Sequence, residues 1–231
     1  MLLLAACGGG GGAQVASTAS FNLQQVWTND FNSEQSKVLP VTGTVTQGSQ
    51  TYTVTGISTV GADKPVASSF EGQSALKRNR MFDLKLVVSG QTLNTTTVIS
   101  EWASTSYQPL GESSTSDGVS AGYIVIRGVA SLPTAVRVGD TGIIYTADIY
   151  ASSAKHYSMG TLEFSYKVEA DTANTVLLTF TRTYNSVFAF STESYATQMI
   201  VDISGAITYV KHTDVYNNFA SGLTMSLDLN Y

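Results

Sequence analysis

The C-terminal end of the chain carries the feature that most restricts its fold. Every second position from Leu223 to Tyr231 is apolar, and the positions between them hold Thr, Ser, Asp and Asn. Side chains of a β-strand point alternately to its two faces, so this period of two predicts a strand with one buried and one polar side. An amphipathic helix would instead repeat its apolar residues about every three or four positions.

The same period recurs along most of the chain. It predicts a hairpin over residues 41–57, with a turn at Gln47–Gln50, and strands over residues 82–88, 162–168 and 176–184. Short turns join most of these segments. We therefore expect an all-β fold, an antiparallel meander of about ten strands that forms a barrel, a half-barrel or a sandwich. Periodicity alone does not distinguish these three.

One segment near the N-terminus has helical spacing instead. Between Phe21 and Phe31, apolar side chains fall on one face and polar ones on the other. This predicts one short helix with Ser20 as its N-cap. We expect the helix to pack Trp27 against the sheet, because an apolar stripe usually faces the core.

Composition excludes several classes of protein. Charged residues make up 13% of the chain and the formal net charge is −5, which argues against a nucleic-acid partner, since such a surface needs a basic patch. Cys7 is the only cysteine, so an intrachain disulfide is excluded. We expect residues 21–231 to form one β-rich domain, with two sub-parts as an alternative that divides near residue 130.

The first residues point to a location. Leu4-Ala5-Ala6-Cys7, followed by Gly8 to Gly12, resembles the lipobox of bacterial lipoproteins. The resemblance implies that residues 1–6 are the remnant of a longer signal peptide, and that residues 7–20 are a lipidated Cys7 and a flexible glycine-rich tether. A diacylated or triacylated cysteine holds stably to a membrane. Gly8 after the cysteine favours the outer membrane in this family.

Further phrases are similar to those of uncharacterised, glycine-tethered proteobacterial lipoproteins. They are residues 70–76 (FEGQSAL), 132–142 (LPTAVRVGDTG) and 168–172 (VEADT). The resemblance implies an envelope lipoprotein and a lipidation site at Cys7, and it implies no activity. We expect a non-enzymatic binding or structural protein without a cofactor, which contacts the membrane through acylated Cys7 and binds an amphiphilic ligand or an envelope protein.

Three polar features are candidates for a binding surface. Residues 104–120 lack periodicity and predict a long polar loop, which would be the first place to look for a partner. Residues 77–80 (KRNR) are the only basic cluster, which predicts an exposed strand start or a contact with anionic headgroups. His156 and His212 are far apart, and His212 shares a strand face with Asp214 alone, so we expect a solvated histidine and no metal ligand set.

Two alternative functions remain open at this stage. Gly118 to Gly122 matches the G-x-S-x-G pattern of serine esterases and would make Ser120 a nucleophile, but that motif requires a preceding strand and a following helix. Here the sequence predicts a polar loop before the serine and a strand, residues 123–127, after it. The last strand, which ends in an aromatic residue, resembles the assembly signal of outer-membrane β-barrels, and that implies a transmembrane barrel as the other alternative.

Overall fold

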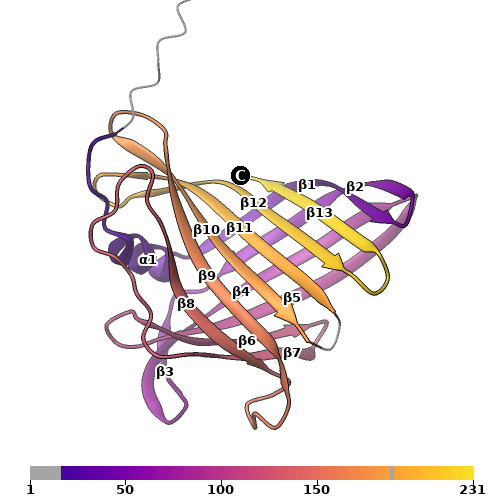
Figure 1. The fold of residues 1–231 in the computed structure, drawn as a ribbon, viewed down its shortest axis with the longest axis horizontal. Coiled ribbons are helices and arrows are strands. Elements are labelled where there is room, and N and C mark those ends of the chain that lie inside the picture. Colours follow the sequence, from indigo (N-terminus) through magenta and orange to yellow (C-terminus); the bar gives the residue numbers. More distant parts are fainter. Residues whose placement is uncertain (1–16, 188–189) are drawn as a thin grey trace, which may run out of the picture.

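The structure is a computed structural model that describes residues 17–187 and 190–231. It holds one α-helix and thirteen β-strands in the described residues (Figure 1). Their bounds are α1 Leu23–Asn32, β1 Gln35–Gln47, β2 Gln50–Ala62, β3 Val66–Phe70, β4 Gln73–Val88, β5 Gln91–Ala103, β6 Pro109–Ser116, β7 Val119–Ile126, β8 Thr141–Tyr150, β9 Ser158–Ala170, β10 Thr175–Ser186, β11 Ser191–Asp202, β12 Ile207–Asn218 and β13 Leu223–Asn230.

The strands form a closed antiparallel barrel of 12 strands, with β3 outside it. Strand β1 pairs with β2, each strand from β3 to β12 pairs with the next in sequence, and two further pairings complete the ring. The first strand pairs with the last, with Val41 opposite Leu229, and β2 pairs with β4, with Val54 opposite Val88. Strands on both sides of residue 130 belong to the same barrel. The structure thus confirms the all-β fold and selects the barrel.

Period-two alternation puts apolar side chains inside the barrel and polar ones outside. The inward side chains form two hydrophobic clusters. The smaller one joins Leu39, Val54, Leu86 and Leu229 from β1, β2, β4 and β13, while the larger one joins α1 to β8–β11. The outward positions of β1 and β2 are mostly threonines. A polar region lies between the two clusters and holds the site described below.

Helix α1 lies across one end of the barrel (Figure 1). Its N-cap is Asn22, whose side chain accepts a hydrogen bond from the Gln25 amide; the prediction of Ser20 was wrong, because the helix starts two residues later. Trp27 is 4% exposed and packs edge-on against Phe164 of β9, which confirms the expected contact with the sheet. No helix in the described residues has the length and apolar character needed to cross a membrane.

The prediction of a polar loop over residues 104–120 was wrong. Residues 109–116 form β6, and after a turn at Asp117 and Gly118 the chain continues as β7. Alternation is missing here because the inward side chains Glu112, Ser114 and Ser116 face the polar interior and line a cavity there. With polar groups on both faces, a strand leaves no period of two in its sequence.

Strand β3 lies between β2 and β4 in the chain. This strand pairs with the first residues of β4 and folds over the outside of the barrel. There Phe70 packs between Trp102 and Tyr123, at 5.1 and 5.6 Å between ring centroids. Gly111 lies directly beneath the Phe70 ring, and a Cβ atom at that position would collide with it.

Candidate ligand-binding cavity

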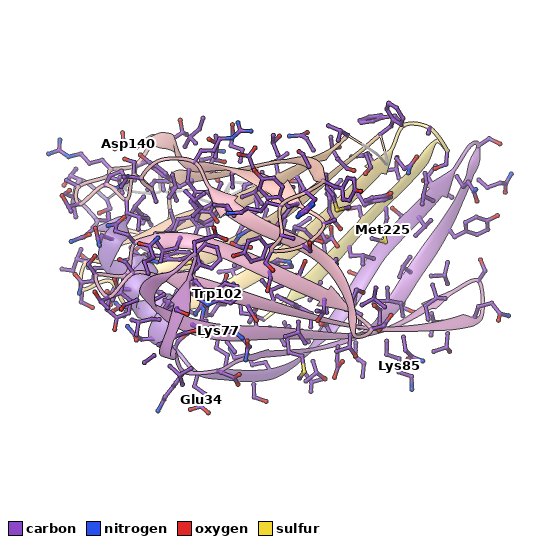
Figure 2. The ribbon with its side chains drawn as sticks, turned by 90° about the horizontal axis from the view of Figure 1, so that it is seen from below. Glu34, Lys77, Lys85, Trp102, Asp140 and Met225 are labelled. Carbon is purple, nitrogen blue, oxygen red and sulfur yellow. The ribbon has the colours of Figure 1, made fainter. Side chains whose placement is uncertain are left out.

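Strand β4 divides the basic cluster at residues 77–80 between its two faces. Lys77 points outward and lies over the Trp102 ring, with its Nζ atom 5.3 Å from the centroid (Figure 2). Arg78 and Arg80 point inward, and Arg78 is 1% exposed. The predicted exposed basic patch is therefore wrong, since alternation along the strand buries its two arginines. A headgroup contact through the four residues together is excluded for the same reason.

The buried arginines belong to an ion-pair network inside the barrel. Arg78 donates to Asp30 of the helix and to Glu101 of β5, each at 2.6 Å. Arg80 also contacts Asp30, at 3.0 Å. Arg182 of β10 forms ion pairs with Glu101 at 3.0 Å and with Glu112 at 3.2 Å. We call these six residues the ion-pair layer: Asp30, Arg78, Arg80, Glu101, Glu112 and Arg182.

The ion-pair layer is balanced in charge, with three guanidinium and three carboxyl groups. Burial on its own would raise the pKa of Asp30, but Arg78 and Arg80 outweigh it and hold the pKa well below its usual range. The same competition, with Arg182 added, lowers the pKa of Glu101. The carboxylates of both residues are therefore ionised at neutral pH, and each charge has a partner.

A cavity of about 350 Å³ begins at this layer and extends toward the end of the barrel opposite α1. Its apolar lining comes mostly from β4, β7, β8 and β13, and its polar lining mostly from β5, β6 and β10–β12. The apolar side chains are Phe82, Leu84, Ile99, Ala121, Ile124, Ile149, Leu227 and Leu229. The aromatic and titratable side chains beyond the ion-pair layer are Tyr184, Glu193, Tyr195, His212 and Asp214.

His212 is one of the inward side chains of β12. Its ring is stacked between Phe82 and Tyr195, at centroid distances of 5.8 and 6.0 Å, and its Nδ1 atom is 2.9 Å from the Thr197 hydroxyl. Burial, together with the charges of Arg80 and Arg182, lowers the pKa of His212 to about 4. The prediction of a solvated histidine was wrong, and the imidazole is neutral at physiological pH.

Asp214 lies two residues further along the same face of β12, directly opposite Tyr195 of β11. Its Oδ1 atom is buried and has no hydrogen-bond partner among the described residues. Burial, and in second place the nearby charge of Glu193, raise the pKa of Asp214 to about 8. Burial also raises the pKa of Glu193, although hydrogen bonding with Tyr195 opposes this. This pair of carboxyl groups lies in the cavity without the guanidinium partners that the ion-pair layer provides.

The raised pKa of Asp214 predicts how stability depends on pH. Between the ordinary aspartate pKa of 3.8 and about 8, the folded protein keeps a proton that the unfolded chain releases. Stability therefore falls as pH rises through this window, by at most roughly 1.4 kcal/mol per pH unit. We expect Asp214→Asn to raise the free energy of unfolding, with a gain that grows from about pH 4 to about pH 8 in urea titrations.

Asp228→Asn is the matched control on the outer face of β13. Asp228 is 2.9 Å from Lys211, and its pKa is lowered: burial raises it, but hydrogen bonds from Lys211 and Thr213 outweigh that. This substitution should give no stabilisation that increases with pH. A gain from Asp214→Asn that stays constant across the pH range would contradict the assignment of a buried, protonated carboxyl group.

The remaining predicted sites lie elsewhere. Cys7 and residues 8–16 of the tether are outside the described residues, as is the side chain of Ser120, whereas residues 17–20 are described and Ser17 is buried. The backbone at Ser120 belongs to β7, so a strand follows the G-x-S-x-G pattern, as predicted. His156 is exposed in the segment between β8 and β9, whereas His212 is inside the barrel. Within the described residues, no three His, Cys, Asp or Glu side chains are grouped to hold a metal ion.

Comparisons of the chain with protein-family models, with curated proteins and with solved structures gave no significant match.

Proposed function

We propose that this protein is a non-enzymatic, lipid-anchored binding protein of the cell envelope that holds a small amphiphilic ligand inside its barrel. The observation that carries the proposal is the internal cavity, which is lined by apolar side chains and by polar and titratable side chains. Its volume of about 350 Å³ lies at the low end of the range typical of small-molecule sites. A ligand with an apolar body and one polar group matches this lining.

The end of the barrel opposite α1 supports entry of such a ligand. Exposed apolar side chains lie at the strand ends there: Val119 is 70% exposed, Phe190 67% and Phe219 70%. Phe190 and Phe219 are adjacent, since the Phe219 amide donates to the Phe190 carbonyl oxygen at 3.0 Å. Large apolar side chains gathered on a surface commonly mark a place where apolar molecules bind.

The outer face of the barrel favours the lipid-anchored protein over the transmembrane-barrel alternative. A wall in contact with lipid needs an outward apolar band, and charged side chains on it are destabilising. Here the outward positions of β1 include Thr42, Thr44 and Thr46 beside one exposed apolar residue, Val38, and ion pairs such as Lys167–Glu169, at 2.8 Å, lie on the same outer surface. This pattern supports a barrel whose outer face is in water.

Filling the cavity tests whether ligands enter it. Ser114 points into the cavity from β6, and Ser113 points outward from the same strand. We expect wild-type protein to enhance the fluorescence of N-phenyl-1-naphthylamine, a neutral amphiphilic probe, and Ser114→Phe to weaken its binding about tenfold or more by occupying the space. Ser113→Phe should bind like wild type. Equal binding by both variants would place the probe outside the barrel.

Lipidation of Cys7 is tested separately in cells. We expect metabolic labelling with an alkyne-tagged fatty acid to mark the wild-type protein and to leave Cys7→Ala unlabelled. Globomycin, which blocks the lipoprotein signal peptidase, should make an uncleaved precursor accumulate. An unlabelled wild-type protein that remains in the supernatant after membranes are sedimented would contradict the anchor.

A further inference from the structure

We propose that the cavity recognises a primary ammonium group, which lies against Asp214 and Glu193 beside the ring of Tyr195. The ligand class is therefore a small amphiphilic amine. This inference rests on the proposed function and adds to it the chemistry of the polar head. It stands on the charge balance of the barrel interior, the hydrogen-bonding state of Asp214 and the residues that surround it.

The ion-pair layer and the rest of the cavity differ in how their carboxyl groups are paired with cations. In the ion-pair layer, each carboxyl group lies within 3.2 Å of at least one guanidinium nitrogen. Glu193 and Asp214 form no ion pair with any described lysine or arginine. His212 lies on the same wall but is neutral. The described lysines and arginines therefore leave both carboxyl groups of the cavity without a cationic partner. Asp214 keeps its proton at neutral pH in the free protein, and a cationic ligand beside it would favour the ionised form.

The carboxyl pair is also short of hydrogen-bond donors. Asp214 Oδ1 is buried within the wall of the cavity and accepts no hydrogen bond from the described residues. A buried acceptor left in this state is unfavourable. An ammonium group carries three donors and a positive charge, so it would donate to the acceptor and stabilise the carboxylate form of Asp214. A hydroxyl group would supply one donor and no charge.

The surrounding side chains fit an amine better than an acid. Tyr184 and Tyr195 lie in edge-to-face contact at 5.5 Å and line the cavity, and aromatic rings attract nearby cations. A carboxylate ligand would need a free guanidinium, yet Arg182 already donates to Glu101 and Glu112. The apolar wall formed by Phe82, Leu84 and Leu227 leaves room for an alkyl chain.

A matched ligand series tests the inference on the full chain. Octylamine, octanol and octanoate have the same chain length and differ in the head group, and each is titrated against bound N-phenyl-1-naphthylamine. We expect octylamine to bind about tenfold or more tightly than octanol, with octanoate the weakest. Asp214→Asn should bring octylamine to about the affinity of octanol and leave octanol unchanged.

Two controls keep the result interpretable. Asp228→Asn, which removes a carboxylate from the outer face, should leave all three affinities unchanged. Glu193→Gln provides a second variant and should also weaken octylamine selectively. Equal binding of octylamine and octanol to wild type would overturn this inference and leave the proposed function standing. Failure of the neutral probe and of all three ligands to bind would overturn both.

Discussion

Arg78→Met is expected to lower the free energy of unfolding by about 3–5 kcal/mol, because removing one partner of a buried ion pair leaves the other uncompensated. Arg78 is 1% exposed and its guanidinium group contacts Asp30 and Glu101, each at 2.6 Å. Methionine fills similar space but donates no hydrogen bond. The remaining contacts to Arg80 and Arg182 offset only part of the loss. Urea denaturation followed by far-UV circular dichroism measures it.

The loss should depend on pH in a defined direction. The pKa values of Asp30 and Glu101 are lowered by the arginines, so the pairing stabilises the fold above the ordinary carboxyl pKa and less as pH falls below it. We therefore expect the difference between Arg78→Met and wild type to shrink below about pH 4. Lys85→Met, on the outward face of the same strand (Figure 2), should change stability by less than about 0.5 kcal/mol. An equally small change in Arg78→Met would argue against the ion-pair layer.

Trp27→Ala is expected to cost about 3–5 kcal/mol as well, through the cavity it leaves between the helix and the barrel. The indole lies 6.0 Å from Phe164 of β9 and 6.1 Å from Phe31 of the helix, measured between ring centroids. Its loss would leave α1 poorly packed over the end of the barrel. The same denaturation experiment, followed by circular dichroism because the substitution alters tryptophan fluorescence, measures the effect.

Gln25→Ala is the control on the exposed face of the same helix. The Gln25 amide donates to the Ser204 carbonyl oxygen at 3.2 Å, an exposed hydrogen bond. Its removal should cost no more than about 1 kcal/mol. If Trp27→Ala costs no more than Gln25→Ala, then the helix contributes little to the stability of the barrel, contrary to the packing described here.

The sequence predicted the β-strands best where one face of the barrel wall is apolar. In β13, Leu227 and Leu229 are buried while Asp228 is outside, and the alternation is plain. In β6, by contrast, Glu112 and Ser114 face a polar interior, so the strand reads as a loop. The candidate site was missed for the same reason. The spacing of two places His212 and Asp214 on one strand face, but with polar residues on both faces of the strand the sequence does not show which face is enclosed.

The basic cluster at residues 77–80 shows a second limit of prediction from sequence. Residues 77–80 are adjacent in sequence, but neighbouring residues of a strand point to opposite sides, so only Arg78 and Arg80 enter the barrel. Their carboxyl partners come from the helix and from β5, at positions 30 and 101, and no local pattern connects them. Strand alternation applied to the cluster would place Lys77 on the face opposite to Arg78 and Arg80. It would not identify Asp30 and Glu101 as the partners of the two arginines.

The sequence by itself determined the all-β class and the apolar face of the helix, because both follow from the local period of side chains along the backbone. Only the tertiary structure decided that the sheet closes, through the pairing of β1 with β13 and of β2 with β4. These contacts join residues far apart in the chain. Closure also decided which polar side chains are enclosed, and so brought Asp214, Glu193 and Tyr195 together around one cavity.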